Sequence, residues 1–379
     1  GTEIEGHLLR LGHSEELREY TVEAVTEDGQ TPTDKVRLAR ERLTSASVVG
    51  ATTSTLASGK YAHILRTFDF GIIDEAAQVT LPSALAALVL IEKFVLIGDE
   101  KQLPPIVRSE RRLRLQEYAG SDPTQTGRWR ALSTPLFEVL RDVVEEGSGD
   151  GLVALTEQFR MNKTICALAS TMFYDGELEP ANSEVANRIL ELPGYDERHK
   201  PHDDLHAILR PARPIVFVDV PVRTGDAPRT NSAEADWIGR IVKAYKEFGL
   251  KLPRIDSSDG GNIAVIAPFR AQVAAIRREL EHALERHPDD VSMLRKVVDT
   301  VDRFQGSERD LVIVSLACGS SGVHELLQDP RRLNVAITRA RHKLIILGNY
   351  DLLSTHPLYH DLFEAMADIC GDDNWRVQG

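Results

Sequence analysis

Residues 70–78 read Phe-Gly-Ile-Ile-Asp-Glu-Ala-Ala-Gln, an apolar run that ends in two adjacent carboxylates, Asp74 and Glu75. A second apolar run, Phe94–Ile97, ends in the same way at Gly98-Asp99. Apolar runs that each deliver an acid at the carboxyl end are typical of buried strands in an open α/β sheet, where ligands bind at that edge. The stretch therefore predicts a site for a divalent cation and a polyphosphate, with Glu75 placed to act on a water.

Length and composition limit the class of protein. The 379 residues are enough for two domains, and 42% hydrophobic and 27% charged residues are typical of a soluble globular protein. The net charge of −13 gives no general attraction to nucleic acid, so any such binding must use a local basic groove. No apolar run has the length of a membrane span, and three distant cysteines make neither a disulfide nor a zinc framework. We expect an intracellular protein, in the cytoplasm or the nucleus.

Strand-like and helix-like segments alternate along both halves of the chain, which predicts two α/β sheets. The Gly-rich segment 145–151 is the clearest linker, so we expect domains at 1–147 and 148–379. In the first half a helix should bury Leu85, Leu88 and Val89. In the second half, residues 191–213 should form a surface excursion. Strands are predicted at 48–52, 70–73, 94–97, 153–155, 215–220, 263–267, 297–301, 311–316 and 344–347.

The acid pair is ambiguous in isolation, because acids after a strand are also common as helix caps. In a nucleotide hydrolase, Asp74 would hold Mg²⁺ and Glu75 would polarise the attacking water. The later loop Gly98–Pro105 contains Gln102, whose amide could sense a γ-phosphate. A plain proline-stiffened turn would explain Pro104 and Pro105 but would not require the glutamine.

Two arginine-bearing segments follow in the second half, around Arg160 and Arg339. A lone arginine is usually a surface residue, but two such segments could form fingers that neutralise charge on a transferring phosphoryl group. The loop Thr300–Glu308 contains Gly306, which permits close approach of a ligand, and Glu308, which could contact a ribose or a nucleic-acid backbone. In isolation this loop also fits a glycine turn with helix-capping residues.

In this order, these segments resemble the superfamily 1B helicases. The nearest group contains the nonsense-mediated-decay RNA helicase, the Sen-type termination helicases and the Okazaki-processing nuclease-helicase. The resemblance extends from about Val48 to Gly348. Its parts are Asp74–Gln78 for motif II, Gly98–Pro105 for motif III, Gln158–Met161 for motif IV, Thr300–Glu308 for motif V, Asn334–Arg341 for motif VI, and Gly50–Thr53 and Ala267–Gln272 for the nucleic-acid motifs.

The resemblance implies two RecA-like domains with parallel sheets flanked by helices, and hydrolysis of Mg²⁺-ATP between them. It implies 5′→3′ travel along single-stranded DNA or RNA. The implied catalytic residues are Glu75 as base, Gln102 as γ-phosphate sensor, and Arg160 and Arg339 as arginine fingers. The implied ligands of the nucleotide and its metal are Asp74, Asp99, Gln158, Gly306 and Glu308, with Asp74 on Mg²⁺. The implied nucleic-acid contacts are Thr52, Thr53, Pro268, Arg270 and Thr300. Arg341 could simply pair with an acid.

One part of the family pattern does not occur in these residues. No Gly-x-x-x-x-Gly-Lys-Ser/Thr phosphate loop is found, and the fragment Ser58–Tyr61 lacks both its spacing and its hydroxyl. The family places this loop upstream of the other motifs, before a strand that Leu8–Gly12 resembles. We therefore expect a first domain that is incomplete at its N-terminus and a chain that is inactive alone. An attached nuclease domain or another segment could lie outside it.

Two other functions remain open. A non-enzymatic, helicase-like scaffold could bind nucleic acid or a protein partner without turnover, although such a scaffold has no need of the residues of a hydrolytic site. A small-molecule kinase with a phosphate loop would explain neither the second domain nor the loop Thr300–Glu308. Strand displacement on tailed substrates, compared between wild type and Glu75→Gln, separates the helicase from the scaffold.

Overall fold

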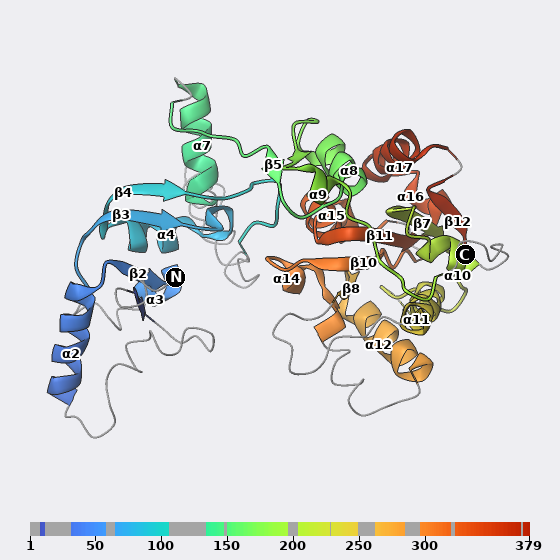
Figure 1. Ribbon diagram of the computed structural model, residues 1–379, viewed down its shortest axis with the longest axis horizontal. Helices are drawn as coiled ribbons and strands as arrows, with labels where there is room; N and C mark the ends of the chain where they lie inside the picture. Colours follow the sequence, from blue (N-terminus) through green and yellow to red (C-terminus); the bar gives the residue numbers. More distant parts are fainter. Residues whose placement is uncertain are drawn as a thin grey trace, which may run out of the picture. The chain divides into compact units, whose positions relative to one another are not determined.

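The computed structural model describes residues 8–11, 32–57, 65–105, 134–147, 150–195, 204–227, 229–248, 262–284, 296–319, 323–372 and 374–379 (Figure 1). The chain divides into two compact units, Gly1–Leu152 and Val153–Gly379. The sequence places this boundary after residue 147. Both units combine helices with parallel strands, which confirms the α/β class.

The second unit is built on one sheet of six strands in the order β12-β7-β11-β10-β8-β9. Every ladder in it is parallel. The carboxyl ends of all six strands therefore lie at one edge, where ligands bind in such sheets. The strands are β7 Ile215–Asp219, β8 Ile263–Ala267, β9 Val298–Thr300, β10 Arg309–Ser315, β11 Ala340–Gly348 and β12 Arg376–Gln378.

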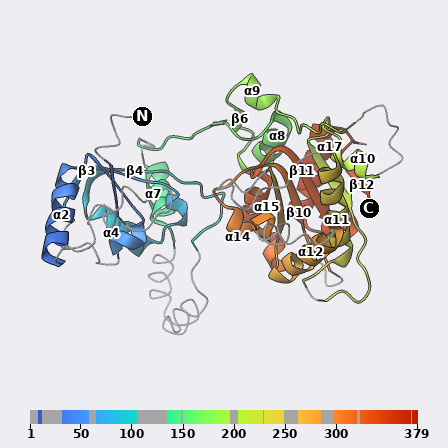
Figure 2. The ribbon, with the colours of Figure 1, turned by 60° about the horizontal axis from the view of Figure 1, so that its bottom comes forward.

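Helices cover both faces of this sheet (Figures 1 and 2). Val216 and Ile345 belong to the core under α10 Asp204–Leu209, α11 Ser232–Glu247 and α12 Arg270–Ala283. On the other face Phe217 contacts Phe363, with ring centroids 4.8 Å apart. That face carries α8 Lys163–Phe173, α15 Pro330–Ile337 and α17 Pro357–Cys370. The short elements are β5 Glu157–Gln158, β6 Glu179–Pro180, α9 Ser183–Ala186, α14 Val301–Phe304, η4 Glu325–Gln328 and α16 Tyr350–Leu353.

The first unit shows two parallel pairs of strands among its described residues, β1 with β2 and β3 with β4. The strands are β1 Leu8–Leu11, β2 Val48–Ala51, β3 Phe68–Ile73 and β4 Ile91–Leu96. The helices are α2 Pro32–Ser45, α3 Thr53–Ala57, η3 Ala76–Gln78, α4 Leu81–Leu88 and α7 Leu136–Glu146. The fragment Ser58–Tyr61 lies outside the described residues.

Two predictions about burial in the first unit are wrong. The strand side chains Phe70 and Ile72, which share one face of β3, are 55% and 63% exposed, whereas Ile73 on the opposite face is buried. Leu85 and Val89 are also exposed, whereas Ala84 and Ala87 of α4 are buried. Leu88, the third residue of that prediction, is partly buried and packs against the cluster of Ile73, Ala76 and Ala87, so the prediction fails for Leu85 and Val89 only.

Two predictions about the second unit are also wrong. Residues 153–155 form no strand, and Val153 and Leu155 are about four-fifths exposed; the ladder begins at Glu157. The segment 191–213 is not a surface excursion in its described part, because Ile208 and Leu209 of α10 are fully buried. The remaining strands form within a few residues of their predicted bounds. None of the described helices combines the length and the apolar character that a membrane crossing would require.

Candidate functional site

The acid pair sits on a sharp turn at the end of β3. Glu75 has φ 52° and ψ 37°, a left-handed conformation that is costly for any residue with a Cβ. The Oδ1 of Asp74 accepts a hydrogen bond from the Glu75 amide at 2.9 Å, and the Gln78 side chain donates to Glu75. Both acids are exposed. Glu75 stands at the N-cap of η3 but makes no side-chain cap bond, so capping does not account for it.

The loop after β4 lies directly beside this turn. The Ala76 amide donates to the Ile97 carbonyl at 2.7 Å, and the Ile97 amide donates to the Ile73 carbonyl at 2.9 Å. A Cβ on Gly98 would lie 2.8 Å from the Ala77 nitrogen, closer than real side chains approach. Glycine is therefore required where the two loops meet.

Asp99 organises the loop that carries the predicted phosphate sensor. Its Oδ1 accepts from the Lys101 amide and its Oδ2 accepts from Nε2 of Gln102, each at 2.9 Å. The structure thus brings Asp74, Glu75 and the Asp99–Gln102 pair to the carboxyl edge of β3 and β4. In these contacts Asp99 holds Gln102 in place through its carboxylate.

Thr52 and Thr53 lie at the carboxyl end of β2. The hydroxyl of Thr52 accepts from the Thr55 amide at 3.1 Å and lies 2.8 Å from the Thr55 hydroxyl. Thr52 is exposed, and half-buried Thr53 begins α3. In this structure the Thr52 hydroxyl caps a short helix.

In the second unit, Gln158 shapes the loop that presents Arg160. Its Oε1 accepts from the amides of Arg160 at 2.8 Å and Met161 at 2.7 Å. Its Nε2 donates to the Met161 carbonyl at 2.9 Å. The Gln158 carboxamide therefore holds the loop through three local bonds.

Arg160 is held from two directions. Its Nε donates to Oε2 of Glu308 at 2.8 Å, and its Nη1 donates to the Thr338 carbonyl at 3.0 Å. Arg188 clamps the backbone of the same loop, donating from Nη1 to the carbonyls of Phe159 at 2.7 Å and Arg160 at 3.1 Å. Sequence reasoning missed Arg188, because no local pattern connects it to a loop 28 residues earlier.

Glu308 is the acid at the centre of this cluster. Burial alone would raise its pKa, but the hydrogen bond and charge of Arg160, with the charges of Arg341 and Arg188, hold the pKa below its ordinary value. Arg341 lies 3.7 Å from Glu308 and 3.6 Å from Asp310. Pairing with acids, the alternative stated for Arg341 above, is what the structure shows.

Arg339 differs from the other predicted finger. Only 2% of it is exposed, and its guanidinium donates to the carbonyls of Val335 and Ser307 and to the Thr338 hydroxyl. Arg160, by contrast, has a side chain that is 31% exposed. Arg339 would have to exchange these internal bonds for a phosphate, whereas Arg160 would exchange only the partners at its surface.

The predicted nucleic-acid residues of the second unit meet at one place on the sheet edge. Thr300 pairs in register with Ala267, so it lies beside Pro268. Pro268 lines a mainly apolar cavity of about 40 Å³. Arg270 is the exposed first residue of α12. Gly306, predicted as a ligand of the nucleotide, has φ 77°, and a Cβ built on it would meet no atom within 4 Å.

A fully buried carboxylate, which the sequence did not predict, binds the chain at the carboxyl end of β10. Glu234 of α11 accepts hydrogen bonds from the Ser315 hydroxyl at 2.6 Å and from the amides of Ala317 at 2.8 Å and Cys318 at 3.3 Å. Burial raises its pKa to about 7 despite these donors. A glutamate in a helical pattern reads as a surface residue, so the sequence carried no signal for it.

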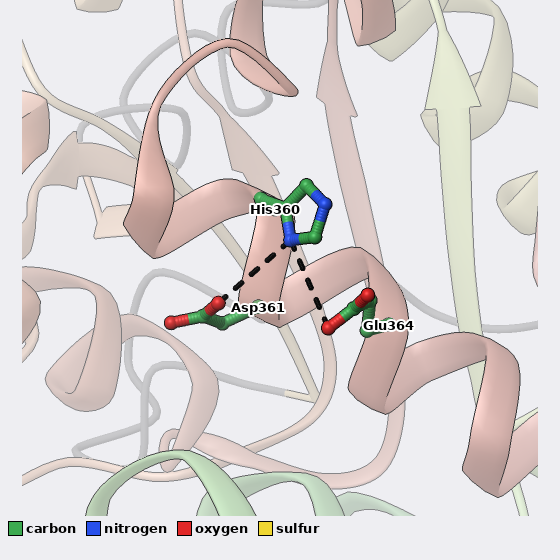
Figure 3. Close-up of side chains that lie close together, drawn as sticks. All are labelled: His360, Asp361 and Glu364. Carbon is green, nitrogen blue, oxygen red and sulfur yellow. Dashed lines mark ion pairs between the residues drawn. The ribbon is translucent and has the colours of Figure 1, made fainter.

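The described residues contain one group with the spacing of metal ligands, His360, Asp361 and Glu364 on α17 (Figure 3). The His360 Nδ1 lies 3.8 Å from Asp361 and 3.7 Å from Glu364. All three side chains are more than half exposed and lie within two turns of one helix. This is the geometry of an ordinary surface ion pair, and we assign no metal to it.

The chain matches two family profiles, each described as an AAA domain, over residues 132–351 and 9–110. It is 33% identical over 304 residues to a Bos taurus protein named DNA replication ATP-dependent helicase/nuclease DNA2, covering 77% of this chain and 26% of that protein. The Xenopus laevis protein of the same name is 32% identical over 355 residues, covering 90% and 30%. The chain thus spans between a quarter and a third of the length of these relatives.

Among solved structures, one described as the PRRSV helicase aligns with 82% of this chain and 40% of its own, with a TM-score of 0.39 and 15% identity. That likeness is too weak to support an argument. The profile over residues 132–351 covers more than half of the chain, and the ordered motifs agree with it. The chain belongs to the AAA-domain family and, within it, to the superfamily 1B helicases that include the DNA2-type helicase/nucleases.

Proposed function

We propose that the protein is an ATP-dependent helicase that travels along single-stranded DNA. The observation that carries this proposal is the turn after β3, where an unfavourable backbone conformation holds Asp74 and Glu75 in solvent without any capping bond. Residues with a Cβ that are held in the left-handed region are concentrated at functional sites. An acid pair at the carboxyl end of a parallel strand fits nucleotide hydrolysis.

The side chains at this edge fit Mg²⁺ and ATP by their chemistry. Mg²⁺ prefers hard oxygen ligands, and Asp74 offers an exposed carboxylate. When Mg²⁺-ATP is bound, ATP would supply the phosphoryl group and Mg²⁺ would neutralise its negative charge. The chain's own residues supply the rest: Glu75 takes the proton of a water, and Asp99 holds Gln102 for contact with the γ-phosphate.

The second unit would contribute positive charge. Arg160 is partly exposed on a loop fixed by Gln158 and Arg188, which suits a finger that must keep its position. In this structure its partner is Glu308, so an anionic phosphate would compete with a carboxylate for the same guanidinium. Arg339 is the second finger in this proposal, after exchange of its internal bonds. Gly306 and Glu308 would lie near the ribose and phosphates.

The choice of DNA rests on the relatives, whose names specify DNA replication. Thr300, Pro268 and Arg270 form the track of the second unit, and Thr52 and Thr53 that of the first. Travel in the 5′→3′ direction, an attached nuclease domain and an intracellular site of action, in the nucleus where there is one, belong to the same proposal.

The test uses the full-length protein and compares wild type with Glu75→Gln. Glu92→Gln is the matched control, because Glu92 is an exposed acid on the neighbouring strand β4. We expect Glu75→Gln to lower DNA-stimulated ATP hydrolysis at least a hundredfold, as for loss of a general base, and to abolish displacement of 5′-tailed duplexes. Hydrolysis that survives Glu75→Gln would refute the assignment. Displacement only on RNA would overturn the choice of DNA.

One observation favours the non-enzymatic scaffold as a second candidate. Arg339 is buried in bonds to its own unit, as expected of a structural arginine. A scaffold would bind single-stranded DNA with an affinity that neither ATP nor Glu75→Gln changes. The helicase would show an affinity that differs between the ATP-bound and ADP-bound states.

A further inference from the structure

Two loops of the second unit meet at Phe269, which lies between Pro268 and Arg270. The Cζ of Arg229, from the loop after β7, lies 5.8 Å from the centroid of the Phe269 ring. The His324 ring, from the segment after β10, meets the same ring edge-on at 4.9 Å. Phe269 is buried, Arg229 is exposed and His324 is half-buried. A cation and a hydrogen-bonding ring thus flank the base of a predicted nucleic-acid motif.

Buried hydrogen bonds lock these loops to one another. The Asn231 amide donates to the Gln272 side chain at 2.8 Å, and Gln272 donates back to the Asn231 carbonyl at 3.0 Å. The Asn231 side chain donates to the Cys318 carbonyl at 3.1 Å, and Gln272 also donates to the Ser315 hydroxyl at 3.0 Å. Asn231 follows Arg229, Gln272 follows Arg270, and Cys318 precedes His324. The network therefore fixes the backbone on which Arg229 and Arg270 stand.

The backbone at Arg229 is itself unusual. Its φ is 64°, in the left-handed region that residues with a Cβ seldom occupy. An exposed residue in this conformation gains no core packing that would offset the strain. What the conformation does achieve is the placement of the guanidinium against Phe269, and such outliers are concentrated at binding sites.

The charge of Arg229 is not neutralised within the described part of the chain. No carboxylate there pairs with its guanidinium, and the nearby Asp226 accepts a hydrogen bond from the Ser232 amide at 3.1 Å. Stacking on a ring leaves the N–H groups of an arginine at its edges, where they can meet phosphate oxygens. The exposed cation is therefore available to an anion.

His324 offers a hydrogen-bond donor beside it. Its Nδ1 accepts from the Leu326 amide at 3.0 Å and so caps η4. In a neutral ring this places the proton on Nε2, the nitrogen that remains for a ligand. The donor and the cation both flank Phe269, and phosphodiester oxygens accept from both kinds of group.

We propose that Arg229 and His324 form a further contact to the phosphate backbone of the single strand, continuing the track of Thr300, Pro268 and Arg270. This inference rests on the proposed function, and it assigns a loop outside the motifs to nucleic-acid binding. Because the contact is to phosphate, it is independent of base sequence. Arg229 adds about one ionic interaction with a phosphate to those made along the strand by the motif residues.

The experiment measures binding of fluorescein-labelled oligothymidine of about 20 nucleotides to the full-length protein, by anisotropy, between about 50 and 200 mM KCl. Arg229→Gln removes the charge and keeps the stem. Arg240→Gln is the matched control, because Arg240 is also an exposed arginine over a ring, 3.9 Å from the Trp237 centroid, but lies on the body of α11. Thermal unfolding of both variants verifies the fold. His324→Asn tests the second residue and keeps a side-chain acceptor for the Leu326 amide.

We expect Arg229→Gln to weaken binding about three- to tenfold at low salt and to lower the salt slope by about 0.7, the value for one phosphate on a single strand. Oligothymidine and oligoadenosine should lose affinity equally, and Arg240→Gln should change neither quantity. His324→Asn should cost a smaller factor, about twofold, at equal slope. A slope unchanged in Arg229→Gln would overturn the inference while leaving the helicase proposal standing. A wild-type protein that does not bind single strands would overturn both.

Discussion

We predict that the carboxyl group of Glu234 makes the protein less stable as the pH rises, the opposite of the usual effect of a carboxylate. The group is fully buried, and burial raises its pKa from 4.5 to about 7. Its folded-state pKa therefore lies above its unfolded value, so between these two pH values the folded protein binds more protons than the unfolded chain. The stabilising contribution is complete below pH 4.5 and is lost as the pH rises through 7.

The magnitude follows from the size of the shift. A difference of about 2.5 pH units, from 4.5 to about 7, corresponds to about 3 kcal/mol of unfolding free energy at about 1.36 kcal/mol per unit. Hydrogen bonds from Ser315, Ala317 and Cys318 oppose the effect of burial, and the pKa of about 7 already includes their contribution. Other acids also make the unfolding free energy depend on pH. The contribution of Glu234 is therefore the difference between the wild-type profile and that of a variant that lacks its carboxyl group.

The assay is urea unfolding followed by tryptophan fluorescence at pH values from 4.5 to 8. Trp237 is a buried reporter on the same helix as Glu234. Glu234→Gln removes the titrating group, and Glu247→Gln, at the exposed end of α11, is the control. A glutamine amide would face the Cys318 amide donor and lower stability at every pH, so only the pH dependence counts. Parallel profiles for wild type and Glu234→Gln would refute the reasoning.

Three further predictions concern the catalytic turn and the finger loop. Glu75→Gly should relieve the left-handed strain and raise the unfolding free energy relative to Glu75→Ala by about 1 kcal/mol, with ATP hydrolysis lost in both; equal denaturation midpoints would contradict this. Gly98→Ala should destabilise the first unit by about 1–3 kcal/mol, because its Cβ would meet the Ala77 nitrogen, whereas Gly50→Ala, with open space, should be tolerated in the same melt. Arg188→Ala should lower kcat for ATP about tenfold and leave KM unchanged, with partial recovery in Arg188→Lys; a change in KM alone would show that Arg188 does not position Arg160.

The sequence by itself determined the class of the fold and the order of its chemical groups. Strands β8 and β10 contain the continuous apolar runs Ile263–Ala267 and Leu311–Val314, which are typical of a parallel sheet that is covered on both faces. The acid pair after β3 was identifiable because a strand end is a local feature. In the structure both acids are exposed, and Glu75 lies in a left-handed turn. Patterns within about ten residues were sufficient for all of these.

Only the tertiary structure decided which polar groups are buried and what they bind. Arg160 meets Glu308 across 148 residues, and Glu234 meets Ser315 across 81, separations at which no local pattern survives. Arg339 is a further example: arginine is usually a surface residue, yet this one is buried like a core residue. A carboxylate or guanidinium can be buried only where partners from distant segments compensate its lost hydration, so its place is set when those segments pack.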